Sequence, residues 1–289
     1  MQKLTVTNSQ GEEFSLGVMK PYILQNLVGI SDAPVELLST RGYQQDGVTP
    51  AGQYLEARLV SFSVAVMGDR IQQVFEARRN LVRFFSPKDT FTCTYQNDYT
   101  VKKFACRVDA MPRFSATQDT GGMLYQVCTV GLVADDPYLL DPDETSIRMA
   151  IAEPALRFPL VFSPSILFGY LSNAEMSITN PGDIKAPVRI RIHGGTVDPK
   201  IENSTTGEYI QVNKEILAGE ILEIRTGYGN KRVEIIDENG TRTNAFQYID
   251  LSSTFWQLVP GENTVVFTAE SGLQSAPIYL YYSGRYVGA

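Results

Sequence analysis

The only histidine in the 289-residue sequence, His193, is the residue on which most acid–base or metal chemistry would depend. A Ser/His/Asp triad or a histidine-based zinc site would have to use it. His193 follows the run VRIRI and precedes Gly194 and Gly195, a pattern typical of a surface turn after a strand. No G-x-S-x-G nucleophile elbow occurs in the sequence. We therefore interpret His193 as a turn residue without a catalytic role.

Other residues with chemical potential are also found in turn-like segments. Asp237, Glu238 and Asp250 could supply a carboxylate pair for glycoside hydrolysis, but acidic residues in turns are usually only solvated. The run 227–231 (GYGNK) lacks the spacing of a phosphate-binding loop and is not followed by a helical pattern. The acidic run DPDE lacks the frame of a calcium loop. The sequence predicts no enzyme, no cofactor and no bound metal ion.

Aromatic residues near the C-terminus are the candidates for contact with a glycan or a protein partner. Tyrosine and tryptophan rings can stack on sugars or anchor interfaces. The candidate contacts are Trp256, Phe255, Tyr228 and Tyr282. The competing interpretation is that Trp256 and alternate tyrosines fill a β-sandwich core, which the alternation in the run IYLYY favours.

Composition and charge exclude several classes of protein. Hydrophobic residues make up 43% and charged residues 20%, so a disordered or fibrous chain is excluded. A net charge of −7 argues against sequence-specific binding of nucleic acid. Cys93, Cys106 and Cys128 each lie in a β-like run at no metal-like spacing, so we expect small buried hydrophobes in a reducing compartment. Neither a signal peptide nor a membrane-spanning run is present, so we expect no membrane insertion.

Strands and one helix are predicted for the first half. Two short strands flank a turn at Asn8–Gly11, and residues 42–52 are predicted to form a long exposed loop. In the strand that follows, alternation places Leu59 on the buried face and Arg58 on the exposed face. The predicted helix has Asp69 as its cap and ends before Pro87. Its apolar stripe is expected to contain Ile71, Val74, Phe75, Leu81, Val82 and Phe85.

A change in pattern near residue 141 predicts two domains. Acidic–proline runs, then Pro154, Pro159 and Pro164, suggest a connection over residues 141–165. Beyond it, turns recur about every ten residues, as in a β-sandwich or jelly roll. We therefore expect domains at residues 1–140 and 166–289, in a mostly β chain with one helix in the first domain.

The order of motifs resembles one known family along nearly the entire chain. In the first half these are Arg58 in its strand, Gly68, the helix end RRNLVRFFSP and Asp136-Pro137-Tyr138. In the second half they are Ile201-x-Asn203, Thr206-Gly207-Glu208-Tyr209-Ile210, Gly219-Glu220, ILEIRT, Lys231-Arg232-Val233, Asn244-x-Phe246-x-Tyr248, Ser253-x-Phe255, Leu258, Pro260-Gly261-x-Asn263, Ile278-Tyr279 and Tyr286. This set resembles the distal tail proteins of siphoviruses, the long-tailed bacteriophages. The glycine-rich turn after Thr226 is a departure from the family pattern.

The resemblance implies a fold and a role. The N-terminal domain would be a tail-tube-like β-sandwich or barrel that forms a homohexameric ring, and the C-terminal domain a galectin-like or jelly-roll β-sandwich. The ring would join the tail-tube protein to the tail-associated tip protein and to receptor-binding or baseplate proteins. The protein would assemble in the cytoplasm of the host bacterium and reside at the tail tip of the virion.

Three other functions stay open from the sequence. A carbohydrate-binding adhesion module would use Trp256 and the tyrosines to hold host-surface glycans. A major tail-tube protein would not need the second domain. A cell-wall hydrolase would need an acid–base or metal cluster, which the sequence lacks.

Overall fold

The structure is a computed structural model that describes residues 2–115, 124–149, 174–272 and 277–289. Strands account for 54% of residues and helices for 7%, with a single α-helix in the described ranges. The mostly β fold with one α-helix is therefore confirmed. Two compact units are present: Met1–Pro142 together with Tyr286–Ala289, and Asp143–Arg285.

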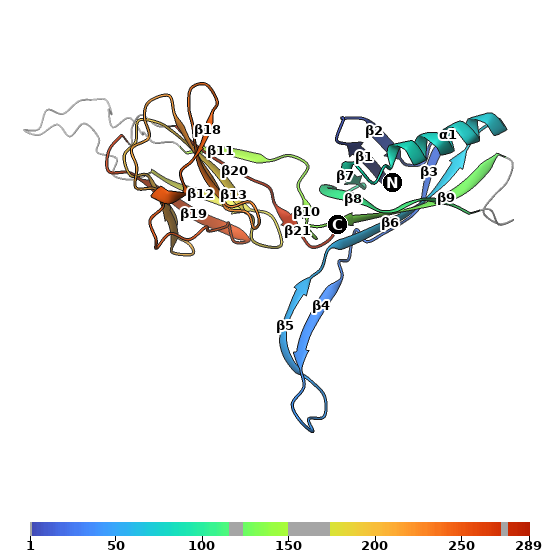
Figure 1. The fold of residues 1–289 in the computed structure, drawn as a ribbon, viewed down its shortest axis with the longest axis horizontal. Coiled ribbons are helices and arrows are strands. Elements are labelled where there is room, and N and C mark those ends of the chain that lie inside the picture. Colours follow the sequence, from blue (N-terminus) through green and yellow to red (C-terminus); the bar gives the residue numbers. More distant parts are fainter. Residues whose placement is uncertain (1, 116–123, 150–173, 273–276) are drawn as a thin grey trace, which may run out of the picture. The chain divides into compact units, whose positions relative to one another are not determined.

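The first unit is built on a nine-stranded sheet with the order β2-β1-β7-β8-β9-β6-β3, to which β10 and β21 are added beside β8 (Figure 1). Its strands are β1 (Lys3–Asn8), β2 (Glu13–Leu16), β3 (Tyr22–Val28), β6 (Arg58–Met67), β7 (Thr90–Gln96), β8 (Val101–Phe114), β9 (Tyr125–Ala134), β10 (Leu139–Leu140) and β21 (Arg285–Tyr286). Phe14 of β2 and Tyr22 of β3 lie 4.3 Å apart between ring centroids, although these strands end the order. The sheet therefore curls around its own core.

Helix α1 (Ile71–Phe84) covers this core with only part of the predicted apolar stripe. Val74, Ala77, Leu81 and Phe84 are buried, whereas Ile71, Phe75 and Val82 are exposed. The predicted cap at Asp69 is wrong: Arg70 is the residue before the first turn. The side-chain oxygen of Gln73 accepts hydrogen bonds from the backbone N–H groups of Asp69 and Arg70. A side chain within the first turn thus satisfies the amides that precede it.

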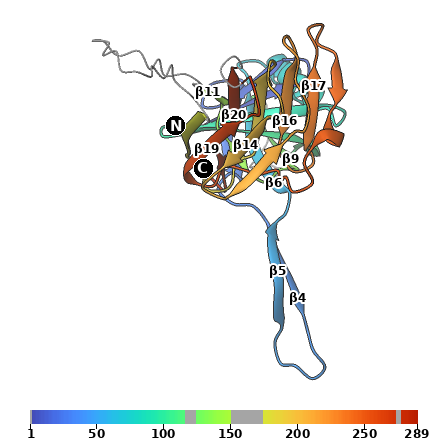
Figure 2. The ribbon, with the colours of Figure 1, turned by 90° about the vertical axis from the view of Figure 1, so that its left-hand side faces the viewer.

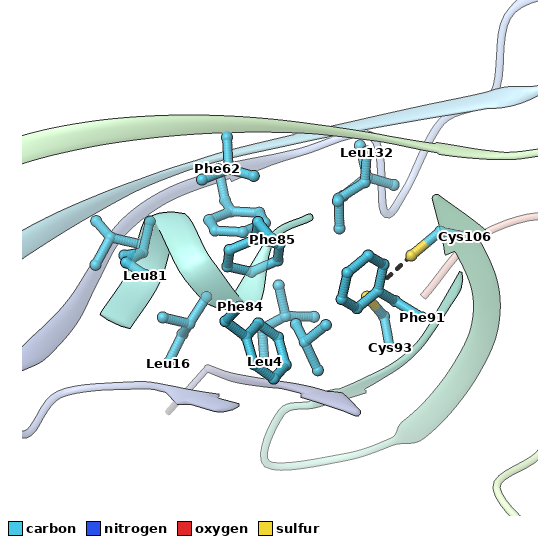
Figure 3. Close-up of a cluster of buried hydrophobic side chains, with 14 of the residues drawn as sticks. Leu4, Leu16, Phe62, Leu81, Phe84, Phe85, Phe91, Cys93, Cys106 and Leu132 are labelled. Carbon is cyan, nitrogen blue, oxygen red and sulfur yellow. Dashed lines mark hydrogen bonds between the residues drawn. The ribbon is translucent and has the colours of Figure 1, made fainter. Parts of the chain in front are cut away.

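The core of the first unit is rich in phenylalanine (Figure 3). Phe85 lies 5.1 Å from Phe84 and 5.8 Å from Phe62 between ring centroids, so helix end and sheet interlock. Cys93 and Cys106, on neighbouring strands, have their Sγ atoms 3.3 Å apart in this core. Burial raises the pKa of the Cys93 thiol well above its ordinary value and that of Cys128 to about 12, so these cysteines act as small hydrophobes.

Arg58 is fully buried at the start of β6, so the predicted orientation of this strand is wrong. Its Nε donates to the Pro137 carbonyl at 2.6 Å. Its Nη1 lies 2.8–2.9 Å from the carbonyls of Gly29, Ile30 and Asp32, and Nη2 donates to that of Val287. Leu59, the neighbour expected to be buried, is 55% exposed. The strand alternates as predicted, but Arg58 points into the core and Leu59 points outwards. This is possible because five backbone carbonyls accept hydrogen bonds from the buried guanidinium.

Strands β4 (Val35–Thr40) and β5 (Thr49–Leu55) form a separate two-stranded hairpin that extends away from the sheet (Figures 1 and 2). The loop expected over residues 42–52 is therefore shorter, because Thr49–Gly52 pairs with β4. Almost every hairpin residue is exposed, including Leu37 at 70%.

The second unit is a sandwich of two antiparallel sheets with the core between them. The six-stranded sheet has the order β11-β20-β13-β16-β17-β18 and the four-stranded sheet β12-β19-β14-β15. The six-stranded sheet contains β11 (Thr145–Met149), β20 (Ile278–Tyr282), β13 (Val188–His193), β16 (Ile221–Arg225), β17 (Arg232–Ile236) and β18 (Arg242–Asn244). The other contains β12 (Ala174–Asn180), β19 (Gly261–Thr268), β14 (Lys200–Asn203) and β15 (Glu208–Gln211); a 3-10 turn, η1, spans Phe246–Tyr248.

The domain limits predicted from the sequence stay a prediction. Thr145–Met149, inside the range expected to connect the domains, forms β11 and pairs with β20 in the second unit. The last four residues, Tyr286–Ala289, belong to the first unit. Pro154, Pro159 and Pro164 lie outside the described residues.

Replacing Arg58 by methionine should destabilise the first unit by at least about 3 kcal/mol, because several buried carbonyls lose their donors together. The measurement is chemical denaturation, with circular dichroism following α1 and fluorescence of the sole tryptophan, Trp256, following the second unit. Replacing the exposed Arg107 by methionine is the control and should cost less than about 0.5 kcal/mol. An unchanged circular-dichroism midpoint in R58M would contradict the role of Arg58.

Candidate partner-binding surfaces

His193 ends β13 in a half-buried position beside an aromatic side chain. Its ring lies 5.5 Å from that of Tyr279 in an edge-on arrangement. Burial, with the nearby charge of Arg191, lowers the pKa of His193 below its ordinary value. The neutral form of this histidine is therefore favoured, and its ring lies against that of Tyr279.

The carboxylates considered for catalysis organise turns. Asp237 accepts hydrogen bonds from the backbone N–H groups of Asn239 and Thr241 at 2.9 and 2.7 Å. Asp250 accepts one from the N–H of Ser252 at 2.9 Å and one from the Tyr209 hydroxyl at 3.2 Å. These contacts are those of acidic residues that stabilise loops.

Two of the four aromatic candidates lie in the core of the second unit. Trp256 is 1% exposed, and its Nε1–H donates to the Ile201 carbonyl at 3.3 Å. Tyr282 is 6% exposed and its hydroxyl donates to the Thr179 carbonyl at 2.8 Å. Because neither ring offers a free face, these two residues cannot stack on a sugar in this fold.

The structure brings the other two candidates together in a partly exposed group, which we call the aromatic cluster: Tyr228, Lys231, Phe246 and Phe255. Phe246 and Phe255 stack with centroids 5.7 Å apart and planes 14° apart. The Lys231 ammonium lies 5.5 Å from the rings of both Tyr228 and Phe255. Tyr228 is 82% exposed because it lies on the turn between β16 and β17, closed by a hydrogen bond from Asn230 N–H to the Gly227 carbonyl.

A second group, missed from the sequence, surrounds Glu223 on the six-stranded sheet. The carboxylate is 1% exposed and accepts hydrogen bonds from Arg191 at 2.7 Å, Arg225 at 2.9 Å and Arg242 at 3.1 Å. Burial pushes the pKa of Glu223 upwards, but the three arginines outweigh it and lower the pKa to about 2. The alternating charges in VRIRI and ILEIR were the available signal, because they place arginines and a glutamate on one face of two strands.

The described ranges hold neither a metal-binding cluster nor a membrane-spanning helix. These residues contain no group of three or more His, Cys, Asp or Glu side chains arranged to hold a metal ion. No described helix combines the length and apolar character of a membrane span.

Comparison with known proteins identifies the second unit. Residues 181–286 match the family model of the siphovirus-type tail component, C-terminal domain. The match lies almost entirely within the second unit. The resemblance to siphovirus distal tail proteins, predicted from the sequence, is therefore confirmed, and the matched residues are those of a siphovirus-type tail component.

Solved structures extend the likeness over the whole chain. The crystal structure of the SPP1 Dit protein, described as a paradigm of the hub adsorption apparatus of phages that infect Gram-positive bacteria, has a TM-score of 0.69 at 15% identity over 98% of each chain. Chains of the phage P2 baseplate in its activated conformation give TM-scores of 0.54 with calcium and 0.52 with strontium, both at 11% identity over all of each chain. At these identities the likeness shows a shared fold. Comparison with curated protein sequences finds no match.

Changing Glu223 to glutamine should lower the free energy of unfolding at pH 7 by about 1–3 kcal/mol, because three buried hydrogen bonds lose their charged acceptor. A carboxylate with a lowered folded-state pKa stabilises the fold above its ordinary value of 4.5, and this contribution is lost as the pH falls towards about 2. The difference between E223Q and wild type should shrink over this window. The exposed Glu215→Gln should show no such dependence, and a pH-independent difference for E223Q would count against the assignment.

Proposed function

We propose that this protein is the structural hub of the tail tip: a homohexameric ring that joins the tail tube to the tip and receptor-binding proteins. The observation that carries the proposal is the family match of the second unit, combined with likeness over 98% of the chain to a hub protein. The first unit, corresponding to the predicted domain 1–140, would form the ring. The second unit would be a galectin-like peripheral sandwich.

The β4–β5 hairpin supports assembly into a ring. A two-stranded hairpin is marginally stable by itself, and its apolar side chains gain little unless another surface covers them. Val35, Leu37, Leu38 and Tyr54 are each at least 40% exposed. A neighbouring subunit that covers these side chains would bury apolar area and order both strands.

The role requires assembly and no catalysis. Asp237 and Asp250 are engaged in turns, and His193 contacts Tyr279, which fits a structural protein. The partners would be further copies of this chain, the tail-tube protein, the tail-associated tip protein and receptor-binding or baseplate proteins. Three free buried cysteines suit folding in the reducing cytoplasm of the host bacterium before incorporation into the virion.

A charged residue on the exposed strand β4 of the hairpin should prevent ring formation. We expect wild type, alone or with its tail partners, to have the mass and the six-fold appearance of a hexamer by light scattering and electron microscopy. Leu37→Asp should give folded monomers, because a carboxylate would have to be desolvated in the contact.

The matched control is Leu251→Asp, a change at a fully exposed leucine of the second unit that should leave the ring intact. A wild-type protein that is monomeric with and without partners would refute the ring. An intact ring in L37D would exclude the hairpin from the contact.

The aromatic cluster favours one second candidate function, contact with host-surface glycans. The exposed rings of Tyr228 and Phe246, with the partly buried Phe255 and the Lys231 ammonium, provide an apolar face for a sugar ring and a donor for its hydroxyls. Of the four contact residues predicted from the sequence, Phe255 and Tyr228 lie in this cluster, whereas Trp256 and Tyr282 are buried.

Tyr228→Ala should weaken glycan binding about tenfold if this second function exists, because one stacking face is lost. Binding would be measured on an array of neutral oligosaccharides. Tyr99→Ala, a change at a 98% exposed tyrosine of the first unit, should leave binding unchanged. An array without a bound glycan would remove the candidate and leave the hub proposal untouched.

A further inference from the structure

The outer face of the six-stranded sheet in the second unit has an unusual charge distribution. Directly opposite residues of antiparallel strands point to the same face of a sheet. Strand register therefore places six arginines on the face opposite the core. This arginine face comprises Arg148, Arg189, Arg191, Arg225, Arg232 and Arg242.

Three of these arginines form a row across neighbouring strands. Arg189 of β13 is opposite Arg225 of β16, which is in turn opposite Arg232 of β17. Neighbouring strands lie about 4.8 Å apart, and like charges directly opposite each other are destabilising. Each arginine of the row has one carboxylate within 4.0 Å: Glu144 for Arg189, Glu223 for Arg225 and Glu234 for Arg232.

Among the described residues of this unit, acidic side chains compensate only part of this charge. Glu223 and Glu234 lie in the adjacent row, and Glu144 pairs with Arg189. Three carboxylates thus balance six guanidinium groups. The segment Asp143–Arg285 has 12 basic and 17 acidic residues, a net charge of −5, yet half of its basic residues lie on this face. The positive charge is therefore concentrated on this face although the net charge of the whole unit is negative.

Glu223 makes the face rigid. Its buried carboxylate holds Arg191, Arg225 and Arg242 by hydrogen bonds, so their guanidinium planes are fixed. A fixed guanidinium loses less entropy when it binds a further carboxylate. Arg232 is 58% exposed, and its Nη1 is 3.9 Å from the nearest Glu234 oxygen, so its donors remain available.

The aromatic side chains of this face favour a protein over a glycan as its partner. Arg189 covers the Tyr281 ring at 4.2 Å, and Tyr279 lies between Tyr281 at 6.4 Å and His193 at 5.5 Å. Ring faces already covered in this way are poor platforms for sugars. Tyrosine and arginine are, in contrast, the residues enriched where protein interfaces gain most of their binding energy.

We propose that the arginine face docks an acidic surface of a protein partner, whose Asp and Glu side chains pair with the row Arg189, Arg225 and Arg232. The partner's carboxylates would repeat the chemistry by which the face already binds Glu223 and Glu234. The partner class rests on the proposed function, because a tail-tip hub must hold other tail proteins at its periphery.

The test uses the full chain and a fluorescein-labelled oligoglutamate peptide as the acidic probe, measured by fluorescence anisotropy. Arg148→Glu with Arg232→Glu should weaken binding at least tenfold, because two exposed cations of the face are reversed. Lys185→Glu with Lys214→Glu makes the same charge change in the same unit outside the strands of this sheet, and should weaken binding less than twofold. Rising salt should weaken wild-type binding, as expected for surface charges.

Several outcomes would overturn the proposal: no binding of oligoglutamate, equal losses in both double variants, or tighter binding of inorganic polyphosphate than of oligoglutamate. Arg232→Gln is a milder variant for which thermal unfolding verifies the fold, and it should also weaken binding. If R232Q disrupts the ring, the face is a contact between copies and the proposal fails. If wild type binds the peptide yet never forms a ring, the hub proposal fails while the acidic docking face stands.

Discussion

The buried guanidinium of Arg58 organises the first unit because its donors must be satisfied within the fold. It reaches carbonyls in three segments that are distant in sequence: residues 29–32, Pro137 and Val287. A charge removed from water is tolerated only where donors are matched in this way. Arg58 therefore holds together the loop after β3, the segment after β9 and the last residues of the chain.

Two further features follow from this constraint. β6 must turn Arg58 inwards, which places Val60, Phe62, Val64 and Val66 in the core and Leu59 outside. The backbone at Gly29 must also approach β6 closely. A Cβ there would lie 1.9 Å from the Leu59 carbonyl oxygen, and φ is 92°, so only glycine fits. The phenylalanine-rich core and helix α1 then pack on a strand whose orientation one arginine determines.

In the second unit the buried charge is the Glu223 carboxylate, and the arginines that pair with it lie on the outer face of a sheet. The inner faces of its two sheets supply an aliphatic core around Trp256, and the outer face of the larger sheet carries arginines held by one buried carboxylate. A turn between two strands of this sheet presents Tyr228, beside the stacked Phe246 and Phe255. Together with the hairpin of the first unit, these are surfaces suited to partners, as the proposed hub role requires.

Periodicity and turn residues in the sequence were sufficient for the mostly β class, the single helix and the sandwich of the second half, because these depend on local pattern. The ordered motifs also identified the tail-protein family. The tertiary structure alone decided which face each pattern turns inwards. Alternation along the strand predicts that Arg58 is exposed, but the side chain is buried. The pattern could not show this because the carbonyl groups that accept its hydrogen bonds lie 26 to 229 residues away in the chain. Likewise, residue type alone makes Trp256, Tyr282 and Tyr228 equally good candidates for binding. The packing of the two sheets buries Trp256 and Tyr282 and leaves Tyr228 exposed. The three arginines around Glu223 come from three different strands, and Glu223 itself lies on β16. Strand order and register were therefore needed to bring these side chains together.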